Sequence, residues 1–317
     1  MKTCLVTGGA GFIGSNLTER LLERGDRVKV LDNFSSGKRA NLDGLSERFP
    51  EQLQILDGDI RDFALVTAAM DGVDYVFHQA AVPSVPRSIR DPLTSNNVNI
   101  QGTLQVFLAA RDAGACRVVF ASSSSVYGES PTLPKREDFT PLPISPYALT
   151  KWVGEEYARL VHKIYDLEVV SLRYFNVFGP RQDPKSEYAA VIPRFIDKLL
   201  TGTSPTIFGD GEQSRDFTFV DNVVEANLRA ADAPCVGGQV FNVACGERYT
   251  LNELVMKLNQ VLGTSLAATH AAPRDGDIKH SLADITSAKA RLCYSPSVGF
   301  MEGLARTAKW FAEYGPR

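Results

Sequence analysis

The 317-residue sequence contains few cysteines and histidines, five and four respectively. The cysteines show no Cys-x-x-Cys spacing and do not cluster with the histidines, so we expect reduced thiols and no bound metal. An excess of one charge is also missing, because the formal net charge is -3 and Lys and Arg form no basic block. This pattern argues against a nucleic-acid-binding surface, and no nucleic-acid partner is expected.

Long hydrophobic runs are missing too. No segment approaches the roughly 20 apolar residues that a membrane-spanning helix needs, so no membrane partner is expected. The first residues, MKTCLVTGGAGFIG, contain no signal-like apolar stretch, and we predict a cytoplasmic protein. With 44% hydrophobic residues the chain is able to bury a substantial core, and its length suits two lobes.

What the sequence does contain is a series of short apolar runs rich in Val, Ile and Phe. Helical spacing separates these runs, and their alternation predicts an α/β fold, a Rossmann-type doubly wound parallel sheet. Ligands of such a sheet bind at the carboxyl ends of its strands. The runs that predict strands lie at 3–8, 27–32, 53–59, 74–80, 116–123 and 168–175.

The alternation of strands and helices ends near residue 175. Loops with Gly and Pro follow, and then a helix over 251–262 and a last helix near 302–314. We therefore predict a sheet domain over 1–175 and a smaller C-terminal lobe over 176–317. Part of 217–245 is expected to return to the first domain.

A glycine-rich loop, TGGAGFIG, lies between the first predicted strand and the first predicted helix. Gly8, Gly11 and Gly14 permit a tight turn and let backbone N-H groups approach a pyrophosphate. Asp32 ends the second strand, where a carboxylate binds the ribose hydroxyls of adenosine and repels a 2′-phosphate. Together these features predict a bound dinucleotide, NAD rather than NADP, and make 1–175 the NAD-binding domain.

Two features near this loop leave alternatives open. Lys38 and Arg39 follow Asp32 and could instead face a 2′-phosphate, and a Gly-rich turn can exist only to pack a helix. Asp59 and Ile60 end the third strand, where they could contact the adenine or simply form a turn.

The stretch SPYALTK, residues 145–151, predicts a helix that runs toward residue 165, with a serine cap and a proline in the first turn. Tyr147 and Lys151 share one face of this helix. A nearby ammonium and a cationic nicotinamide ring favour the phenolate, so the pair could act as a general base. An isolated pair at this spacing is more often two surface neighbours. Ser123, at the carboxyl end of the fifth strand, could bind a substrate hydroxyl or merely cap a turn.

TGGAGFIG, Asp32, DGDI, HQAA, SSSSVYG and YALTK, in this order, resemble the extended short-chain dehydrogenase/reductase family, in particular its nucleotide-sugar 4-epimerases. The resemblance covers the whole chain, because RYFNVFGPRQ, FGDGEQSRDFTFVDN and APRDGDIKHSLADI continue it. It implies that Tyr147 takes the proton of the sugar 4-hydroxyl while carbon 4 gives hydride to NAD. It also implies that Lys151 holds the nicotinamide ribose and lowers the pKa of the tyrosine, and that Ser123 binds the sugar hydroxyl.

The resemblance further implies a set of contacts. The implied cofactor contacts are Gly8, Gly11, Phe12, Ile13, Gly14, Asp32, Asn33, Asp59, Ile60, Ala80, Ala81, Asn99, Tyr147, Lys151 and Tyr174. The implied substrate contacts are Ser84, Arg87, Ser124, Ser125, Asn176, Ala190, Val191, Arg215, Arg274, Asp277 and Ser281. Among these, Asn176 and Arg215 match positions that contact the nucleotide diphosphate, and Arg274 with Asp277 matches a pair that grips phosphate and uridine ribose. A salt bridge remains the structural alternative for Arg215.

Departures from the family pattern indicate the subtype. Related sugar dehydratases carry an Asp-Glu pair where this chain has Ser124 and Ser125, and related decarboxylases usually have a glutamate at the place of Ser125. Of these three subtypes of the family, the epimerase is the one whose pattern the sequence still fits. Ser281 stands where many UDP-glucose-restricted enzymes carry a tyrosine, and a small residue there would leave room for a 2-acetamido group. The structural alternative is that Ser281 is small merely for packing.

We therefore predict a 4-epimerase of UDP-N-acetylglucosamine and UDP-N-acetylgalactosamine, and possibly of UDP-glucose and UDP-galactose. A UDP-glucose-only enzyme, a net dehydrogenase and a non-catalytic NAD-binding member remain alternatives, and Arg181 and Lys185 keep a UDP-glucuronate epimerase open. The helices near 97–113 and 147–165 resemble those of a dimer interface in the family. We accordingly expect a homodimer.

Overall fold

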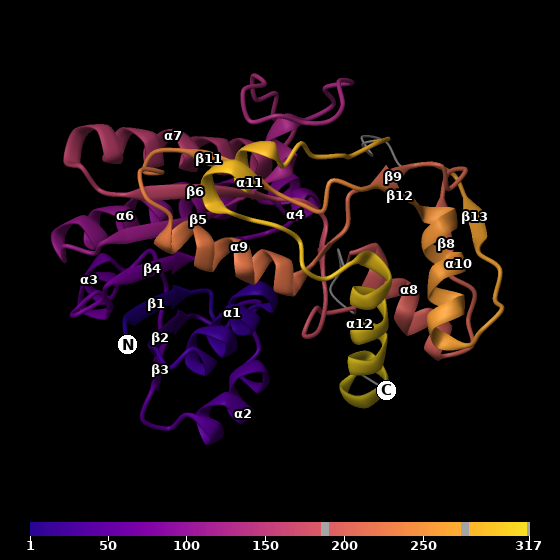
Figure 1. The fold of residues 1–317 in the computed structure, drawn as a ribbon, viewed down its shortest axis with the longest axis horizontal. Helices are drawn as coiled ribbons and strands as arrows, with labels where there is room; N and C mark the ends of the chain where they lie inside the picture. The colour runs from indigo at the N-terminus through magenta and orange to yellow at the C-terminus, as the bar shows by residue number, and fades with distance from the viewer. Residues whose placement is uncertain (185–189, 274–278, 316–317) are drawn as a thin grey trace.

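The computed structural model describes residues 1–184, 190–273 and 279–315. Its centre is a seven-stranded sheet in which every neighbouring pair of strands is parallel (Figure 1). The strand order, β11-β6-β5-β4-β1-β2-β3, is that of a doubly wound sheet and confirms the predicted fold class. The strands are β1 (Thr3–Thr7), β2 (Arg27–Asp32), β3 (Leu53–Asp57), β4 (Tyr75–His78), β5 (Arg117–Ser123), β6 (Val169–Tyr174) and β11 (Val240–Val243).

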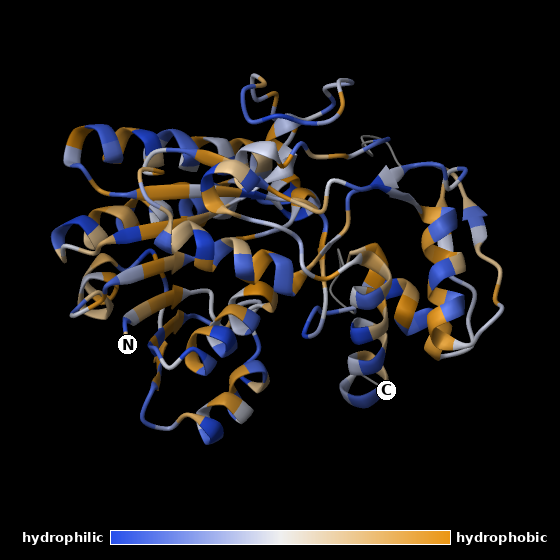
Figure 2. Cartoon of the chain, viewed as in Figure 1, coloured by the Kyte–Doolittle hydropathy of each residue, from blue (hydrophilic) through white to orange (hydrophobic). Residues whose placement is uncertain are grey.

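Helices cover both faces of the sheet, because each face buries a separate apolar cluster. The helices that pack on one face are α1 (Phe12–Glu23), α2 (Ala40–Arg48) and α9 (Val220–Asp232). Those on the other face are α3 (Phe63–Ala69), α6 (Thr103–Asp112) and α7 (Pro146–Tyr165). Figure 2 shows the strands largely in hydrophobic colours, whereas blue and orange residues alternate along α7.

Helix α7 begins as the sequence predicts. Ala148 N donates to Ser145 Oγ at 3.2 Å, and Pro146 lies in the first turn. Gly154 lets the helix approach β5, because a Cβ there would lie 2.5 Å from Cζ of Phe120. This close packing holds the first turns of α7 beside the carboxyl end of β5.

The β11 strand was not among the predicted strands. It pairs with β6, so a segment far along the chain completes the edge of the sheet. Its four residues, VFNV, include a buried asparagine, and such a short interrupted run gives no clear strand pattern. Helix α9 and the short α11 (Thr286–Leu292) pack beside it.

The C-terminal part of the chain forms a helical layer at the right of Figure 1. Helix α10 (Leu251–Leu262) is the helix predicted at those residues, and it packs on α8 (Val191–Leu200) and α12 (Phe300–Tyr314). A capping box of Thr250 and Glu253 starts α10, and Gly263 ends it in a left-handed conformation. The short strand pairs here are β8 (Thr206–Phe208) with β13 (Thr269–Ala271), and β9 (Ser214–Arg215) with β12 (Tyr249–Thr250).

Short elements complete the rim of the sheet. The short elements are α4 (Val85–Arg90), α5 (Pro92–Asn96), the π-helical turn η1 (Asn97–Gly102), the 3-10 turn η2 (Ser124–Tyr127), β7 (Val177–Phe178) and β10 (Thr218–Phe219).

Among the described residues, no helix is both long and apolar enough to span a membrane.

Candidate active site

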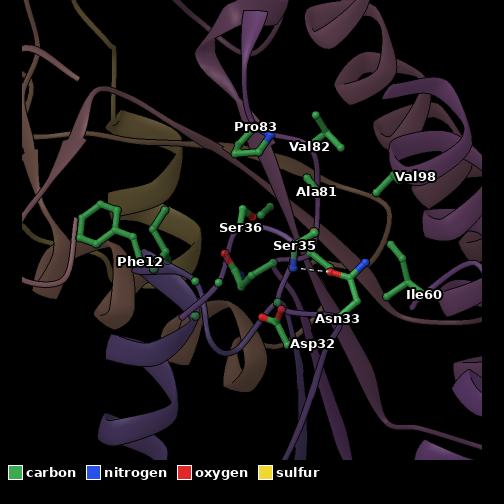
Figure 3. Close-up of a pocket in the computed structure, with 18 of the residues that line it drawn as sticks. Phe12, Asp32, Asn33, Ser35, Ser36, Ile60, Ala81, Val82, Pro83 and Val98 are labelled. Atoms are coloured by element: carbon green, nitrogen blue, oxygen red, sulfur yellow. Dashed lines mark hydrogen bonds between the residues drawn. The ribbon is translucent and has the colours of Figure 1, made fainter. Parts of the chain in front are cut away.

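A cavity of about 510 Å³ runs along the carboxyl ends of the strands. Figure 3 shows residues from several of these ends around it, with the hydrogen bond from Ser35 N to Asn33 Oδ1. The predicted contacts that line it are Gly8, Gly11, Phe12, Ile13, Gly14, Asp32, Asn33, Asp59, Ile60, Ala80, Ala81, Arg87, Tyr147, Lys151, Tyr174 and Ala190. The sheet therefore gathers most of the predicted cofactor contacts in one place.

The glycine loop between β1 and α1 fits a pyrophosphate. Gly8 has a φ of +70°, and a Cβ at Gly14 would lie 2.2 Å from Gly8 O, so both positions need glycine. A Cβ at Gly11 would meet only Gly8 O, at 3.2 Å, so this edge of the loop is open. Helix α1 has no side-chain cap and no acidic residue in its first turn. Its free N-H groups and dipole therefore suit an anion at this point.

The carboxylate of Asp32 is fixed at the end of β2. Its Oδ2 accepts from Ala10 N at 2.9 Å and its Oδ1 accepts from Phe34 N at 2.8 Å. Burial raises the pKa of Asp32, and the two backbone N-H groups oppose that rise. Each oxygen keeps a second lone pair that could accept from a ribose hydroxyl.

The two cations that could have faced a 2′-phosphate have carboxylate partners. Lys38 Nζ lies 2.9 Å from a carboxylate oxygen of Asp183. Arg39 pairs with Asp57 at 2.8 Å. This pairing agrees with NAD rather than NADP.

Asp59, in the lining of this cavity, is held as an anion. Arg61 binds both of its carboxylate oxygens, at 2.9 and 2.7 Å, and Asn33 Nδ2 donates to it at 2.8 Å. The hydrogen bonds from Arg61 are the main reason that the pKa of Asp59 falls to about 2. Ile60 is buried beside it and faces the glycine at position 102.

Ser123, Tyr147 and Lys151 come together from β5 and α7. Lys151 Nζ donates to Ala121 O at 2.7 Å and lies 6.0 Å from the centre of the Tyr147 ring. Burial lowers the pKa of Lys151 to about 7, and the Glu155 carboxylate opposes that fall. Ser123 Oγ accepts from the backbone N-H of residue 125 at 3.2 Å, so it also caps the η2 turn.

Burial raises the pKa of Tyr147, whereas a hydrogen bond with Ser123 lowers it. The family resemblance implied a lowered pKa through Lys151, but in the protein alone burial is the larger effect. A cationic nicotinamide ring beside the phenol would add the positive charge that favours the phenolate.

Tyr174 belongs to a buried hydrogen-bonded group that sequence reasoning missed. Its hydroxyl lies 2.8 Å from Nδ2 of Asn227 and 3.1 Å from Nε2 of Gln79. Burial raises the pKa of Tyr174, which therefore stays neutral. Gln79 stands within the HQAA motif, but Asn227 comes from α9, and no local pattern connects it to this site.

A second cavity, of about 380 Å³, adjoins the first at Tyr147 and Tyr174. It is polar at one side because the serines of η2 line it together with Ser281 and the buried Lys135, a residue that sequence reasoning missed. The predicted residues on its wall are Ile13, Ser123, Ser124, Ser125, Tyr147, Tyr174, Asn176, Arg215 and Ser281.

A third cavity, of about 250 Å³, continues from Asn176 and Arg215. Ala190 and Val191, both predicted substrate contacts, also line it. Arg215 Nη1 donates to Ser214 O at 3.0 Å and to the carbonyl of residue 279 at 3.2 Å. Aromatic rings supply much of the remaining wall, from Phe178, Phe195, Phe208 and Phe217.

Two of the described contacts, Ser84 and Asn99, lie outside these cavities. Ser84 caps α4, where its Oγ accepts from the backbone N-H of residue 87 at 3.2 Å. Asn99 holds the loop after β4, because Val82 N donates to its Oδ1 at 2.8 Å. Neither lines any of these three cavities in the described part of the protein. Arg274 and Asp277 lie outside the described residues.

The model of the NAD dependent epimerase/dehydratase family matches residues 4–244, and the chain belongs to this family. UDP-glucose 4-epimerase of Mycolicibacterium smegmatis is 42% identical and covers 98% of each chain. The solved structure of the UDP-N-acetylglucosamine 4-epimerase from Methanobrevibacter ruminantium, in complex with UDP-N-acetylmuramic acid, is 44% identical. It has a TM-score of 0.94 and covers 98% of each chain.

A Thermus thermophilus UDP-glucose 4-epimerase solved with NAD is 37% identical, with a TM-score of 0.88 over 98% of this chain and 99% of that one. These matches confirm the enzyme class predicted from the sequence, an NAD-dependent UDP-sugar 4-epimerase.

Proposed function

We propose that this epimerase interconverts UDP-N-acetylglucosamine and UDP-N-acetylgalactosamine, and that it also accepts UDP-glucose and UDP-galactose. The observation that carries the proposal is the small side chain of Ser281, which lines the same cavity as Ser123 and Tyr147. A bulky residue there would take the space that a 2-acetamido group needs. The relative at 44% identity, described as a UDP-N-acetylglucosamine 4-epimerase, supports this substrate.

In the proposed reaction Tyr147 accepts the proton of the sugar 4-hydroxyl and later returns it. Ser123 orients that hydroxyl, and Lys151 binds the nicotinamide ribose and contributes the positive charge that favours the phenolate. Bound NAD would supply the redox chemistry that side chains lack, namely reversible hydride transfer at carbon 4 of the sugar. Turnover therefore consumes no cofactor, which separates this reaction from a net dehydrogenase.

The remaining contacts are proposed to hold the two nucleotides. Asp32 binds the ribose hydroxyls of the NAD adenosine, and the glycine loop binds its pyrophosphate. Asn176 and Arg215 bind the diphosphate of the substrate, where a guanidinium gives two charge-assisted hydrogen bonds. The aromatic cavity beside them, with Phe208 and Phe217, suits the flat uracil base.

A UDP-glucuronate substrate receives less support. Arg181 lines the first cavity, that of about 510 Å³, and donates to Glu19 of α1 at 2.6 Å. Lys185 lies outside the described residues. Arg181, the described one of the two cations that kept this alternative open, is therefore already paired with a carboxylate.

The proposal also includes a domain division, a homodimer and a cytoplasmic location. The NAD-binding domain comprises residues 1–175 and part of 217–245, and residues 176–317 otherwise bind the substrate. Exposed apolar side chains on α7, those of Leu160 and Ile164, support a second copy of the chain as the partner. The cytoplasmic location rests on the sequence alone, and cell fractionation tests it.

Proton NMR of the purified protein tests the substrate proposal, with UDP-N-acetylglucosamine and UDP-glucose in separate samples and no added cofactor. Appearance of the galacto epimer from the acetylated sugar is the expected result. Turnover of UDP-glucose alone would contradict the role given to Ser281. If neither sugar is converted and UDP-glucuronate is, the proposed substrate is wrong.

A further inference from the structure

A buried ion pair lies next to the proposed catalytic residues. Arg173 Nε and Nη2 donate to the two carboxylate oxygens of Glu155, at 2.9 and 2.7 Å, and each side chain is only 3% exposed. Ser122 Oγ donates to the same carboxylate. Arg173 also stacks over the ring of Tyr127, with its guanidinium carbon 4.6 Å from the ring centre.

This pair joins the three elements that carry the site. Glu155 comes from α7, Ser122 from β5 and Arg173 from β6. Each is close in sequence to a proposed site residue: Ser122 precedes Ser123, Arg173 precedes Tyr174, and Glu155 follows Lys151 by four residues. At a spacing of four, Glu155 and Lys151 lie on one face of the helix.

The groups that face Lys151 from β4, β5 and the start of α7 are uncharged. From β4, His78 is neutral, because burial lowers its pKa to about 3. From β5 come the Ala121 carbonyl and the Phe120 ring, and from α7 comes the neutral phenol of Tyr147. A buried ammonium needs a nearby anion to stay charged, and Glu155 is the carboxylate that acts on it. From β6, Arg173 faces Glu155 rather than Lys151.

We propose that Glu155 is a positioning residue for the epimerase reaction, which keeps Lys151 protonated and, through Ser122, fixes the strand end that carries Ser123. Tyr147, Lys151 and Glu155 are then spaced four residues apart on one side of α7, and each contributes to the proposed reaction. The inference rests on the proposed roles of Tyr147 and Lys151. Its first consequence, the charge of Lys151, is measurable without any turnover.

The direct test is the titration of Lys151 followed by NMR of protein labelled with ¹³C at lysine Cε. A Lys151→Met variant identifies the signal. In Glu155→Gln the midpoint is expected to fall by about one pH unit or more, because the favourable negative charge is lost. Glu156→Gln is the matched control: the neighbouring carboxylate is 47% exposed and pairs with Arg159, so the midpoint should not move.

The Glu155→Gln change leaves Arg173 buried without its partner charge, and this can unfold the protein. The double variant Glu155→Gln/Arg173→Met removes both charges and serves as a second test. We expect it to fold and still to show the lowered midpoint of Lys151. A normal midpoint in a folded double variant would overturn the inference, because the carboxylate would then have no action on Lys151.

Turnover gives an independent reading. In a folded Glu155 variant, kcat for the UDP-sugar should fall with little change in KM, and the alkaline limb of kcat should move to lower pH with the Lys151 midpoint. A lower kcat with an unchanged midpoint would overturn the inference and leave Glu155 only a structural role. A lowered midpoint in a protein that turns over no UDP-sugar would uphold the effect of Glu155 on the charge of Lys151, while the proposed function and the positioning role in epimerization fail.

Discussion

Tyr147 combines a raised pKa with a proposed role as a base, and the charges around it decide whether that role is chemically reasonable. Burial raises its pKa, while the hydrogen bond with Ser123 lowers it. Lys151, 6.0 Å from the ring centre, and a cationic nicotinamide ring would favour the phenolate further. The phenol is therefore expected to lose its proton only in the complex with oxidised cofactor.

The Tyr147→Phe variant tests this role because it keeps the ring and removes the proton acceptor. We expect kcat to fall roughly 10²- to 10⁴-fold, while the dinucleotide stays bound. Proton NMR of the product and the NAD released on denaturation give the two readings. Tyr157→Phe, the same change on the same helix, is the control, and turnover by Tyr147→Phe near the wild-type rate would exclude the assigned base.

Ser281 gives the second prediction at this scale. Its backbone is fixed, because its N-H donates to Ser214 O at 3.0 Å, so a larger side chain at 281 has little freedom to move away from the cavity. In Ser281→Tyr we expect kcat/KM for UDP-N-acetylglucosamine to fall roughly tenfold or more, with UDP-glucose largely unaffected. The comparison of the two sugars is its own control. An equal loss for both would mean that Ser281 does not determine the space at carbon 2.

At the scale of single elements, the conformation of the glycine loop depends on a close approach between the backbone atoms of Gly8 and Gly14. A Cβ at Gly14 would clash with the Gly8 carbonyl, so Gly14→Ala should distort the loop and weaken NAD binding roughly tenfold or more. The retained NAD and its affinity measure this. Gly44→Ala in α2 is the control, because a Cβ there meets no atom within 4 Å. If both variants retain NAD equally, the loop does not need glycine at position 14.

His78 connects three elements and links their packing to pH. It lies between Thr7 at the end of β1 and Thr103 of α6, at 2.7 and 2.9 Å, and burial lowers its pKa from 6.5 to about 3. The unfolded chain therefore binds a proton that the folded chain rejects. The stability from this residue is complete above the unfolded pKa and is lost as pH falls toward the folded pKa.

We therefore expect the free energy of unfolding to drop between about pH 6.5 and pH 3, with His78 contributing at most about 1.4 kcal/mol per pH unit. His78→Gln keeps polar groups for both threonines but does not titrate in this range. Urea unfolding at several pH values should give a smaller slope for this variant. Identical slopes for the two proteins would contradict the assignment.

At the scale of the whole molecule, two exposed apolar side chains lie on one face of α7. Leu160 and Ile164 lie one turn apart and are 37% and 62% exposed. Residues at a spacing of four lie on the same side of a helix, and helices in this region were expected to form a dimer. These side chains support the proposed homodimer.

The double variant Leu160→Glu/Ile164→Glu is expected to turn a dimer into a folded monomer, since it places two charges on the proposed interface. Light scattering coupled to size exclusion measures the mass, and circular dichroism checks the fold. Met256→Glu is the control, because Met256 is 64% exposed on α10, in the C-terminal part of the chain. A monomeric wild type, or a variant that remains a dimer, would exclude this interface.

The sequence by itself determined the features that depend on neighbouring residues. Strands β1 to β6, the Gly-rich loop and the start of α7 follow from local periodicity and capping, because side-chain spacing and backbone conformation act over a few residues. Only the tertiary structure decided the rest. It added β11 to the sheet, brought Asn227 to Tyr174, and paired Glu155 with Arg173. Each of these contacts joins different elements of the fold, and their partners are selected by burial and charge in the folded core rather than by any local pattern.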